Sequence, residues 1–180
     1  NRMGGDIKTY SSEGKGSTFI FCIPLSSGSV SERVPDLVIS RANLSAKKIS
    51  SLLFSPCNGV LQSLSDMFSE INAACVLKAL SADVAFRMFC NAVEHKRTLD
   101  VVVIDIDSLN NDGVSLCKRI IEFEKSKALE NRTVIIINYS KDDVLAQVAS
   151  ECKEYVYCFL KKPFSKAILY NVLCNSIDVS

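Results

Sequence analysis

The sequence has a single histidine, no Cys-x-x-Cys pair among its eight cysteines, and no marked excess of charge of either sign. A structural zinc site needs clustered cysteines and histidines, so the first two scarcities argue against one. A formal net charge of +1 argues against nucleic acid or another polyanion as a partner. No apolar run approaches the roughly 18 residues of a membrane span, so we expect no direct membrane contact. Unpaired cysteines in apolar surroundings are typical of buried thiols in the reducing cytoplasm, where we expect the protein.

Short apolar runs separated by polar turns are abundant instead. With 48% hydrophobic residues, the 180-residue chain can bury a sizeable core. Strand-like and helix-like patterns alternate five times after residue 35, which predicts an α/β doubly wound parallel sheet. The predicted strands are 37–39, 75–79, 101–105, 134–139 and 156–160, and the predicted helices are about 46–54, 82–93, 114–127, 143–152 and 165–177. Residues 55–71 also have helical spacing, and we interpret them as an insertion or an extended first helix.

The most apolar predicted strand ends in an acid. Four β-branched residues precede Asp105, as in a strand that is buried on both faces of a parallel sheet. The carboxyl end of such a strand faces the crevice where open α/β sheets bind ligands. Asp112 and Gly113 follow seven and eight residues later, and this spacing resembles the phosphoacceptor region of response-regulator receiver domains. The resemblance implies a flavodoxin-like sheet of five parallel strands in the order 2-1-3-4-5, with Asp105 as the phosphoacceptor.

Three more positions extend the resemblance across residues 35–180. Lys162, which is followed by proline, matches the family's lysine after the fifth strand, which neutralises the incoming phosphoryl group. Ser140 falls where the family keeps a hydroxyl that holds a phosphoryl oxygen, and Asn138 is the less favoured occupant of that role. Phe159 matches the aromatic residue whose rotation reports phosphorylation, although core packing explains it equally well.

The sequence departs from the family at the metal site. Receiver domains carry an adjacent acidic pair at the end of the first strand, and these acids hold the catalytic Mg²⁺. The matching positions in the predicted first strand are Ser40 and Arg41, which provide no carboxylate. Asp105 and Asp107 are then the remaining metal ligands, and we expect Mg²⁺ to bind weakly at most because it prefers a near-octahedral set of oxygen ligands.

The first 25 residues have a different pattern. A Gly-Gly-x-Ile strand leads through Gly-x-Gly-Ser-Thr-Phe to a strand that closes with Ile-Pro-Leu, which predicts a β-hairpin. The string is similar to the end of the ATP-binding domain of histidine kinases, and residues 26–34 form a small, polar linker. The family's metal-binding helix and nucleotide loop are absent, so we expect residues 1–25 alone not to bind ATP. The resemblance implies a C-terminal fragment of a hybrid sensor histidine kinase, whose parent protein is a phosphotransferase and can be membrane-bound.

Two functions are open for residues 35–180. In the first, the missing acids leave a degenerate pseudo-receiver that regulates its kinase or binds partners without chemistry, so this chain is not an enzyme by itself. In the second, the domain is an active receiver that takes a phosphoryl group from phosphohistidine onto Asp105. The partners implied are a histidine-kinase or phosphotransfer domain and a second copy in a homodimer. A flavodoxin-like cofactor enzyme is disfavoured because no glycine follows the predicted first strand.

Overall fold

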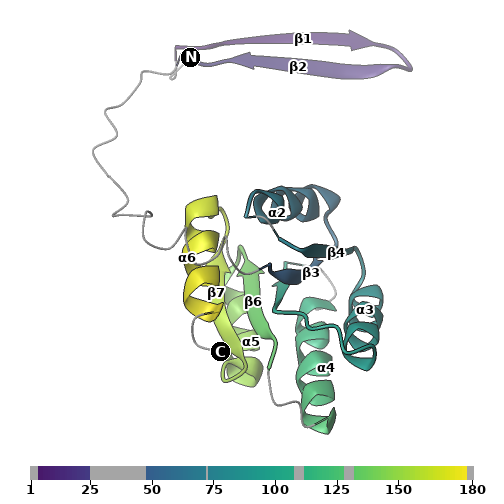
Figure 1. Ribbon diagram of the computed structural model, residues 1–180. Helices are drawn as coiled ribbons and strands as arrows, with labels where there is room; N and C mark the ends of the chain where they lie inside the picture. Colours follow the sequence, from purple (N-terminus) through teal and green to yellow (C-terminus); the bar gives the residue numbers. More distant parts are fainter. Residues whose placement is uncertain (1–3, 25–47, 72, 108–111, 128–131, 178–180) are drawn as a thin grey trace. The chain divides into compact units, whose positions relative to one another are not determined.

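The computed structural model describes residues 4–24, 48–71, 73–107, 112–127 and 132–177 (Figure 1). The chain divides into two compact units, Asn1–Pro35 and Asp36–Ser180. The first contains an antiparallel pair of strands, and the second contains a five-stranded sheet with helices.

The hairpin of the first unit consists of β1 (Asp6–Ser12) and β2 (Gly16–Cys22). Gly14 and Gly16 turn the chain with φ angles of 74° and 92°, a region that glycine adopts without steric cost. The predicted hairpin is therefore confirmed. Phe19 and Phe21 are 58% and 66% exposed, so within its own unit the hairpin leaves aromatic side chains uncovered.

The sheet of the second unit is parallel throughout. Its spatial order corresponds to 2-1-3-4-5 along the chain, which confirms the predicted doubly wound, flavodoxin-like topology. The strands in this order are β4 (Cys75–Ala79), β3 (Ser50–Phe54), β5 (Val101–Asp105), β6 (Val134–Tyr139) and β7 (Val156–Lys161).

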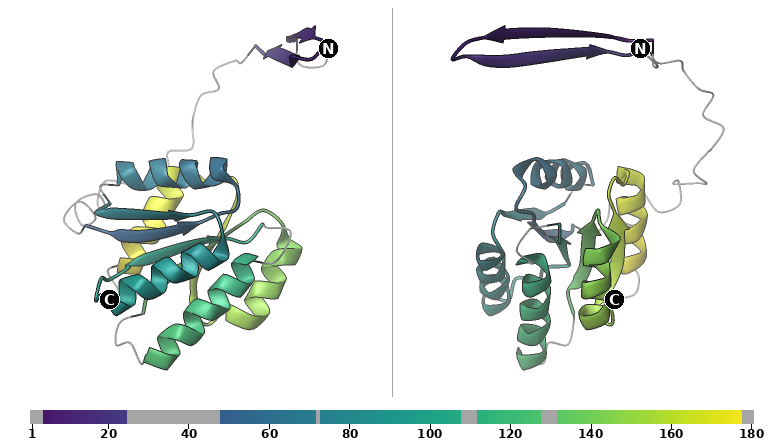
Figure 2. Two further views of the ribbon diagram at one scale, coloured as in Figure 1. Left: turned by 90° about the vertical axis from the view of Figure 1, so that its right-hand side faces the viewer. Right: turned by 180° about the vertical axis from the view of Figure 1, so that it is seen from behind.

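Helices cover both faces of this sheet (Figure 2). One face packs against α3 (Ala82–Glu94), α4 (Asp112–Lys127) and α5 (Asp142–Cys152), and the other against α2 (Asn58–Glu70) and α6 (Lys166–Ile177). Successive side chains of a strand point to opposite faces. In β5, Val102 and Ile104 therefore join the core under α3, α4 and α5, while Val101 and Val103 join the core under α2 and α6. By the same alternation, Asp105 lies on the α2–α6 side.

The first strand of the sheet differs from the prediction. Residues 50–54 form β3 and not the predicted helix, and the predicted strand at 37–39 lies outside the described residues. The spacing of Ile49, Leu52 and Leu53 fits a helix, but an apolar run this short fits a doubly buried strand equally well. β3 lies between β4 and β5, so both of its faces need apolar side chains. Residues 55–71 are accordingly not an insertion, because they contain α2, the crossover helix from β3 to β4.

Gly113, in the first turn of α4, allows this helix to lie directly against the end of β5. A Cβ atom at Gly113 would lie 2.6 Å from the Asp105 carbonyl oxygen and 3.0 Å from the Ile106 Cα. Because both contacts are with backbone, we expect Gly113→Ala to lower the free energy of unfolding by about 1–3 kcal/mol in urea denaturation. Gly59 in α2 provides the control, since a Cβ there would meet only the Cys57 Sγ, at 3.9 Å. Gly59→Ala should be neutral or stabilising by up to about 1 kcal/mol, and equal effects of the two substitutions would contradict this packing.

Candidate functional site

Polar side chains gather where the strands of the sheet end. Ser55 follows β3, Asp105 is the last residue of β5, and Asp107 lies in the loop after it. Ser140 follows β6 and Lys162 follows β7. Because the carboxyl ends of parallel strands share one edge of the sheet, residues far apart in sequence meet there. We call these five residues the Asp105 cluster.

Asp105 is the buried centre of this cluster, with a side chain only 3% exposed. Its Oδ1 accepts hydrogen bonds from the Lys162 Nζ at 2.9 Å and from the Asp107 backbone N–H at 3.1 Å. Its Oδ2 accepts one from the Ser55 Oγ at 2.8 Å. The Ser55 Oγ in turn accepts from the Cys57 backbone N–H at 3.1 Å, which orients the hydroxyl. Both oxygens of the buried carboxylate are thus occupied, as a buried charge requires.

Lys162 joins Asp105 to the second carboxylate, Asp107, with which it forms another ion pair. Asp107 also accepts hydrogen bonds from the Ser140 backbone N–H at 2.8 Å and from the Ser140 Oγ at 2.6 Å. Burial acts to raise the pKa of Asp107, but the hydrogen bonds from Lys162 and Ser140 outweigh it and leave the pKa lowered. Burial likewise acts to lower the pKa of Lys162, but its bonds to the two aspartates leave that pKa raised. Asp107 and Lys162 are therefore both charged at neutral pH.

Asn138 lies beside the cluster but takes no part in its hydrogen bonds. It is the Cα partner of Asp105 in the β5–β6 pairing and is only 1% exposed. Neither its side-chain oxygen nor its nitrogen has a hydrogen-bond partner within the described ranges. An unpaired buried polar group costs about 1–3 kcal/mol. Strand register places Asn138 next to Asp105 in the sheet, but the side chain that hydrogen-bonds to an aspartate of the cluster is that of Ser140, which donates to Asp107.

The remaining predicted residues have different surroundings. Phe159, in β7, is partly buried and packs on the core under α3, α4 and α5. Ser40 and Arg41 lie outside the described residues. Their assignment to the acidic-pair positions was based on a strand at 37–39, and that basis is lost because the strand next to β5 ends at Phe54. Ser55 follows that strand and contacts Asp105, a role that the sequence interpretation missed.

The donor set does not fit a resident Mg²⁺ ion. Mg²⁺ requires several oxygen ligands in near-octahedral geometry, usually from carboxylates. Phe54, Ser55 and Pro56, at the end of β3, provide no carboxylate, and the Lys162 ammonium already lies between Asp105 and Asp107. No group of three or more His, Cys, Asp or Glu side chains among the described residues is arranged to hold a metal ion.

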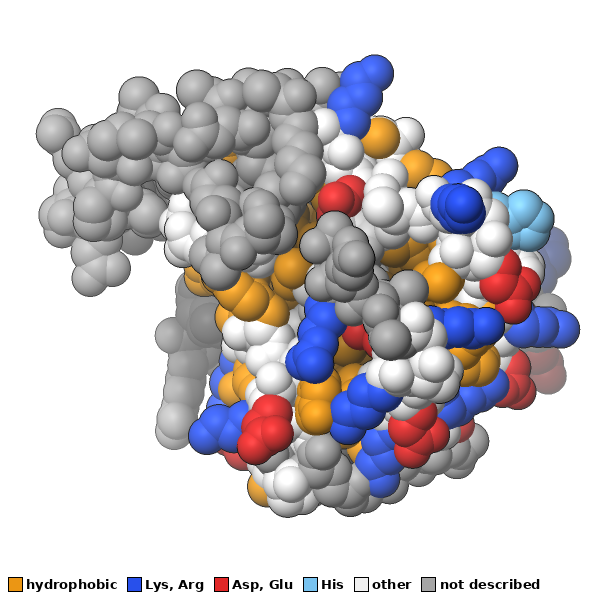
Figure 3. All heavy atoms as spheres, turned by 60° about the horizontal axis from the view of Figure 1, so that its bottom comes forward, with side chains coloured by type: hydrophobic (Ala, Val, Ile, Leu, Met, Phe, Trp, Pro, Cys, Tyr) orange, Lys and Arg blue, Asp and Glu red, His pale blue; other side chains and the backbone are white. Residues whose placement is uncertain are grey.

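The surface of the described residues carries charge of both signs. On the face in Figure 3, Lys and Arg side chains are interspersed with Asp, Glu and apolar side chains. This differs from the contiguous basic stripe that marks nucleic-acid-binding proteins. Among the described helices, none is both long enough and apolar enough to cross a membrane.

Several solved structures with a similar fold are receiver domains. The receiver domain of the histidine kinase CKI1 from Arabidopsis thaliana, complexed with Mg²⁺ and BeF₃⁻, is 17% identical with a TM-score of 0.62, covering 77% of this chain and 97% of that one. A response regulator receiver domain protein from Clostridium thermocellum is 24% identical with a TM-score of 0.58, covering 73% and 95%. A CheX–CheY–BeF₃–Mg²⁺ complex from Borrelia burgdorferi gives 17% identity and a TM-score of 0.58, covering 72% and 89%. No protein-family model and no curated protein sequence matches the chain. The second unit therefore has the receiver fold.

Lys162 should be needed for stability because it compensates the buried Asp105. We expect Lys162→Met to lower the free energy of unfolding by about 2–4 kcal/mol, since it leaves a buried carboxylate without its cation. The neighbouring Lys161 pairs with Asp142 at the surface, with side chains 54% and 71% exposed, so Lys161→Met is a matched control with a much smaller expected loss. Adding Asp105→Asn to Lys162→Met should recover part of the stability. Equal losses for the two lysine variants in urea denaturation would contradict the compensating role.

The shifted pKa values of Asp107 and Lys162 predict how the free energy of unfolding depends on pH. The folded pKa of Asp107 lies below its ordinary 3.8, so its contribution is complete above that pH and is lost as the pH falls through the folded pKa. The folded pKa of Lys162 lies above its ordinary 10.5, so its contribution is complete below that pH and is lost as the pH rises through the folded pKa. Urea denaturation across the acid range should show a shallower loss of stability for Asp107→Asn than for the wild type. Asp66→Asn, which removes an exposed carboxylate of α2, should retain the wild-type slope, and an unchanged slope in Asp107→Asn would overturn the assignment.

Proposed function

We propose that the second unit is a pseudo-receiver, a signalling module of a two-component phosphorelay that acts through protein contacts and not through efficient phosphoryl transfer. The observation that supports this most strongly is the position of Lys162. Its ammonium lies between Asp105 and Asp107, while Ser55 occupies the other oxygen of Asp105. The carboxylates are thus neutralised from within the chain.

Phosphoryl transfer to Asp105 would require a different arrangement. The attacking carboxylate oxygen must be reachable, and cations must neutralise the charge that develops on the phosphoryl oxygens. Asp105 is almost fully buried and both of its oxygens accept hydrogen bonds. With no carboxylate at Ser55, the site lacks the metal ligand that would bring the second positive charge. These features disfavour catalysis and leave the receiver fold as a scaffold for protein contacts.

An active receiver is the second candidate, and one observation favours it. The Lys162 Nζ lies 2.9 Å from the Asp105 Oδ1 at the carboxyl edge of the sheet, where the family resemblance puts an acceptor and its stabilising lysine. In this alternative, Lys162 leaves Asp107 and follows the phosphoryl group, with Ser140 as a second donor to it. Phe159 would then change its packing with phosphorylation.

The proposed parent protein is a hybrid histidine kinase. Residues 6–22 form a hairpin. The sequence of residues 1–25 resembles the end of a kinase ATP-binding domain, and 26–34 would link it to the receiver unit at 35–180. The CKI1 domain, one of the similar structures, is itself the receiver domain of a histidine kinase. The partner proposed for this chain is accordingly a histidine-kinase or phosphotransfer domain.

Labelling with a small phosphodonor tests the proposal. We expect no Mg²⁺-dependent labelling of the wild type by acetyl phosphate, and Asp105→Asn identifies any signal that comes from another residue. Ser55→Asp/Pro56→Asp places carboxylates beside Asp105 and should create a metal site. At Mg²⁺ concentrations ten times the Kd, that variant should gain about 1.4 kcal/mol of stability, or roughly 3–6 °C in melting temperature, whereas the wild type gains little.

Two outcomes would count against the pseudo-receiver. One is Mg²⁺-dependent labelling of the wild type on Asp105. The other is strong stabilisation of the wild type by millimolar Mg²⁺. Both are measured on the unmodified chain, so they decide the question even if the double variant folds poorly.

A further inference from the structure

A large cavity lies at the end of the sheet opposite to the Asp105 cluster. Its volume is about 730 Å³, within the range of roughly 300–1,000 Å³ that is typical of small-molecule sites. Ser50 and Cys75, the first residues of β3 and β4, lie at its edge, and the end of α3 forms one wall. Leu77, Met88 and Leu99 give it an apolar lining.

The rim of this cavity is cationic, because Lys96 and Arg97 follow one another after the end of α3. The Lys96 N–H donates to the Val93 carbonyl at 3.0 Å and the Arg97 N–H to the Ala92 carbonyl at 2.8 Å. These two bonds are those of a Schellman motif, so the backbone that carries both cations is held in place. Lys96 has a φ of 54°, in a position where helices usually have glycine. The backbone conformation at this position favours glycine, which has no side chain, but the chain has a lysine there.

Lys96 and Arg97 are available to a ligand. Both are exposed, and no acidic side chain of the described residues forms an ion pair with either of them. A guanidinium group binds carboxylates through two parallel hydrogen bonds, and an ammonium group adds a second positive charge. A purely ionic ligand such as inorganic phosphate would leave the apolar lining unused, and a neutral apolar ligand would leave the cations unused.

We propose that this cavity binds a small organic carboxylate with an apolar body, such as a medium-chain or aromatic carboxylate. The apolar body packs on Leu77, Met88 and Leu99, and the carboxylate pairs with Lys96 and Arg97. Because the cavity is at the amino ends of β3 and β4, this site is separate from the Asp105 cluster. The binding function is therefore independent of whether Asp105 accepts a phosphoryl group.

Competition with a fluorescent probe tests the ligand chemistry. The probe is 8-anilinonaphthalene-1-sulfonate, which is both anionic and aromatic, and the competitors are octanoate and octanol, which share an apolar chain and differ in charge. We expect octanoate to displace the probe at about tenfold lower concentration than octanol. Lys96→Gln/Arg97→Gln should weaken octanoate binding by about tenfold, which corresponds to about 0.7 kcal/mol for each of two exposed ion pairs, within their measured range.

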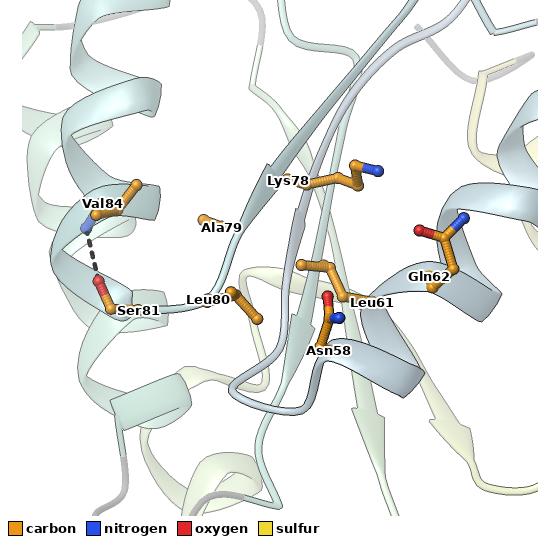
Figure 4. A pocket seen from close by; sticks show the side chains of 8 residues that line it. All are labelled: Asn58, Leu61, Gln62, Lys78, Ala79, Leu80, Ser81 and Val84. Atoms are coloured by element: carbon orange, nitrogen blue, oxygen red, sulfur yellow. Dashed lines mark hydrogen bonds between the residues drawn. The ribbon is translucent and has the colours of Figure 1, made fainter.

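A second cleft provides a matched control variant. It has a volume of about 460 Å³ at the carboxyl end of β4, and one cation, Lys78, lines it together with Asn58 and Gln62 of α2 (Figure 4). Lys78→Gln removes an exposed cation from this other cleft and should leave octanoate binding unchanged. If Lys78→Gln weakens binding as much as the double variant does, the anion binds by general charge attraction and the proposal is wrong.

Cysteine alkylation locates the bound octanoate. The Cys75 thiol lines the cavity, whereas the exposed cysteines Cys22 and Cys57 do not. Octanoate should slow the alkylation of Cys75 by iodoacetamide and leave the rates at Cys22 and Cys57 unchanged, as followed by peptide mass spectrometry. An unprotected Cys75 at saturating octanoate, or equal displacement of the probe by octanol and octanoate, would overturn the assignment.

Discussion

The ion pairs of Lys162 with Asp105 and Asp107 are the interaction on which the rest of the site depends. A carboxylate buried as fully as Asp105 is stable only if cations and donors compensate it, and Lys162, Ser55 and the Asp107 backbone do so. These groups come from three strand ends, so the compensation requires β3, β5 and β7 to end at one edge of the sheet. The 2-1-3-4-5 order meets that requirement. Sheet topology and charge compensation therefore depend on each other.

Most of the fold could be predicted because the sheet is buried on both faces. A strand in that position must be a nearly continuous apolar run, and β5 and β6 have such runs with exactly the predicted bounds. The exception is β3, where two serines precede the apolar residues and the remaining spacing also fits a helix. Its identity as a strand depends on its neighbours β4 and β5, which local periodicity does not reveal.

Only those residues of the site that belong to a recognisable short sequence motif could be predicted. Asp105 and Lys162 each end or follow a recognisable strand, so parallel topology puts them at one edge of the sheet, and the resemblance to receiver domains implied that they meet there. Ser55 was missed because its place beside Asp105 depends on where β3 ends. The unpaired amide of Asn138 depends on the β5–β6 register and on side-chain directions, which the sequence does not encode locally.

We infer that an internal lysine, and not a metal ion, neutralises the two carboxylates of the cluster. The most direct test is a titration of the ¹⁵N-labelled wild-type chain with millimolar Mg²⁺, alone and with fluoroberyllate, observed at the backbone amides of Asp107 and Ser140. Both amides donate hydrogen bonds within the cluster, so occupation of the site by a metal would shift their resonances. Because Lys162 already neutralises both carboxylates, we expect no saturable shift of either resonance. Saturable shifts centred on these two amides would contradict it and would make the cluster a working metal site.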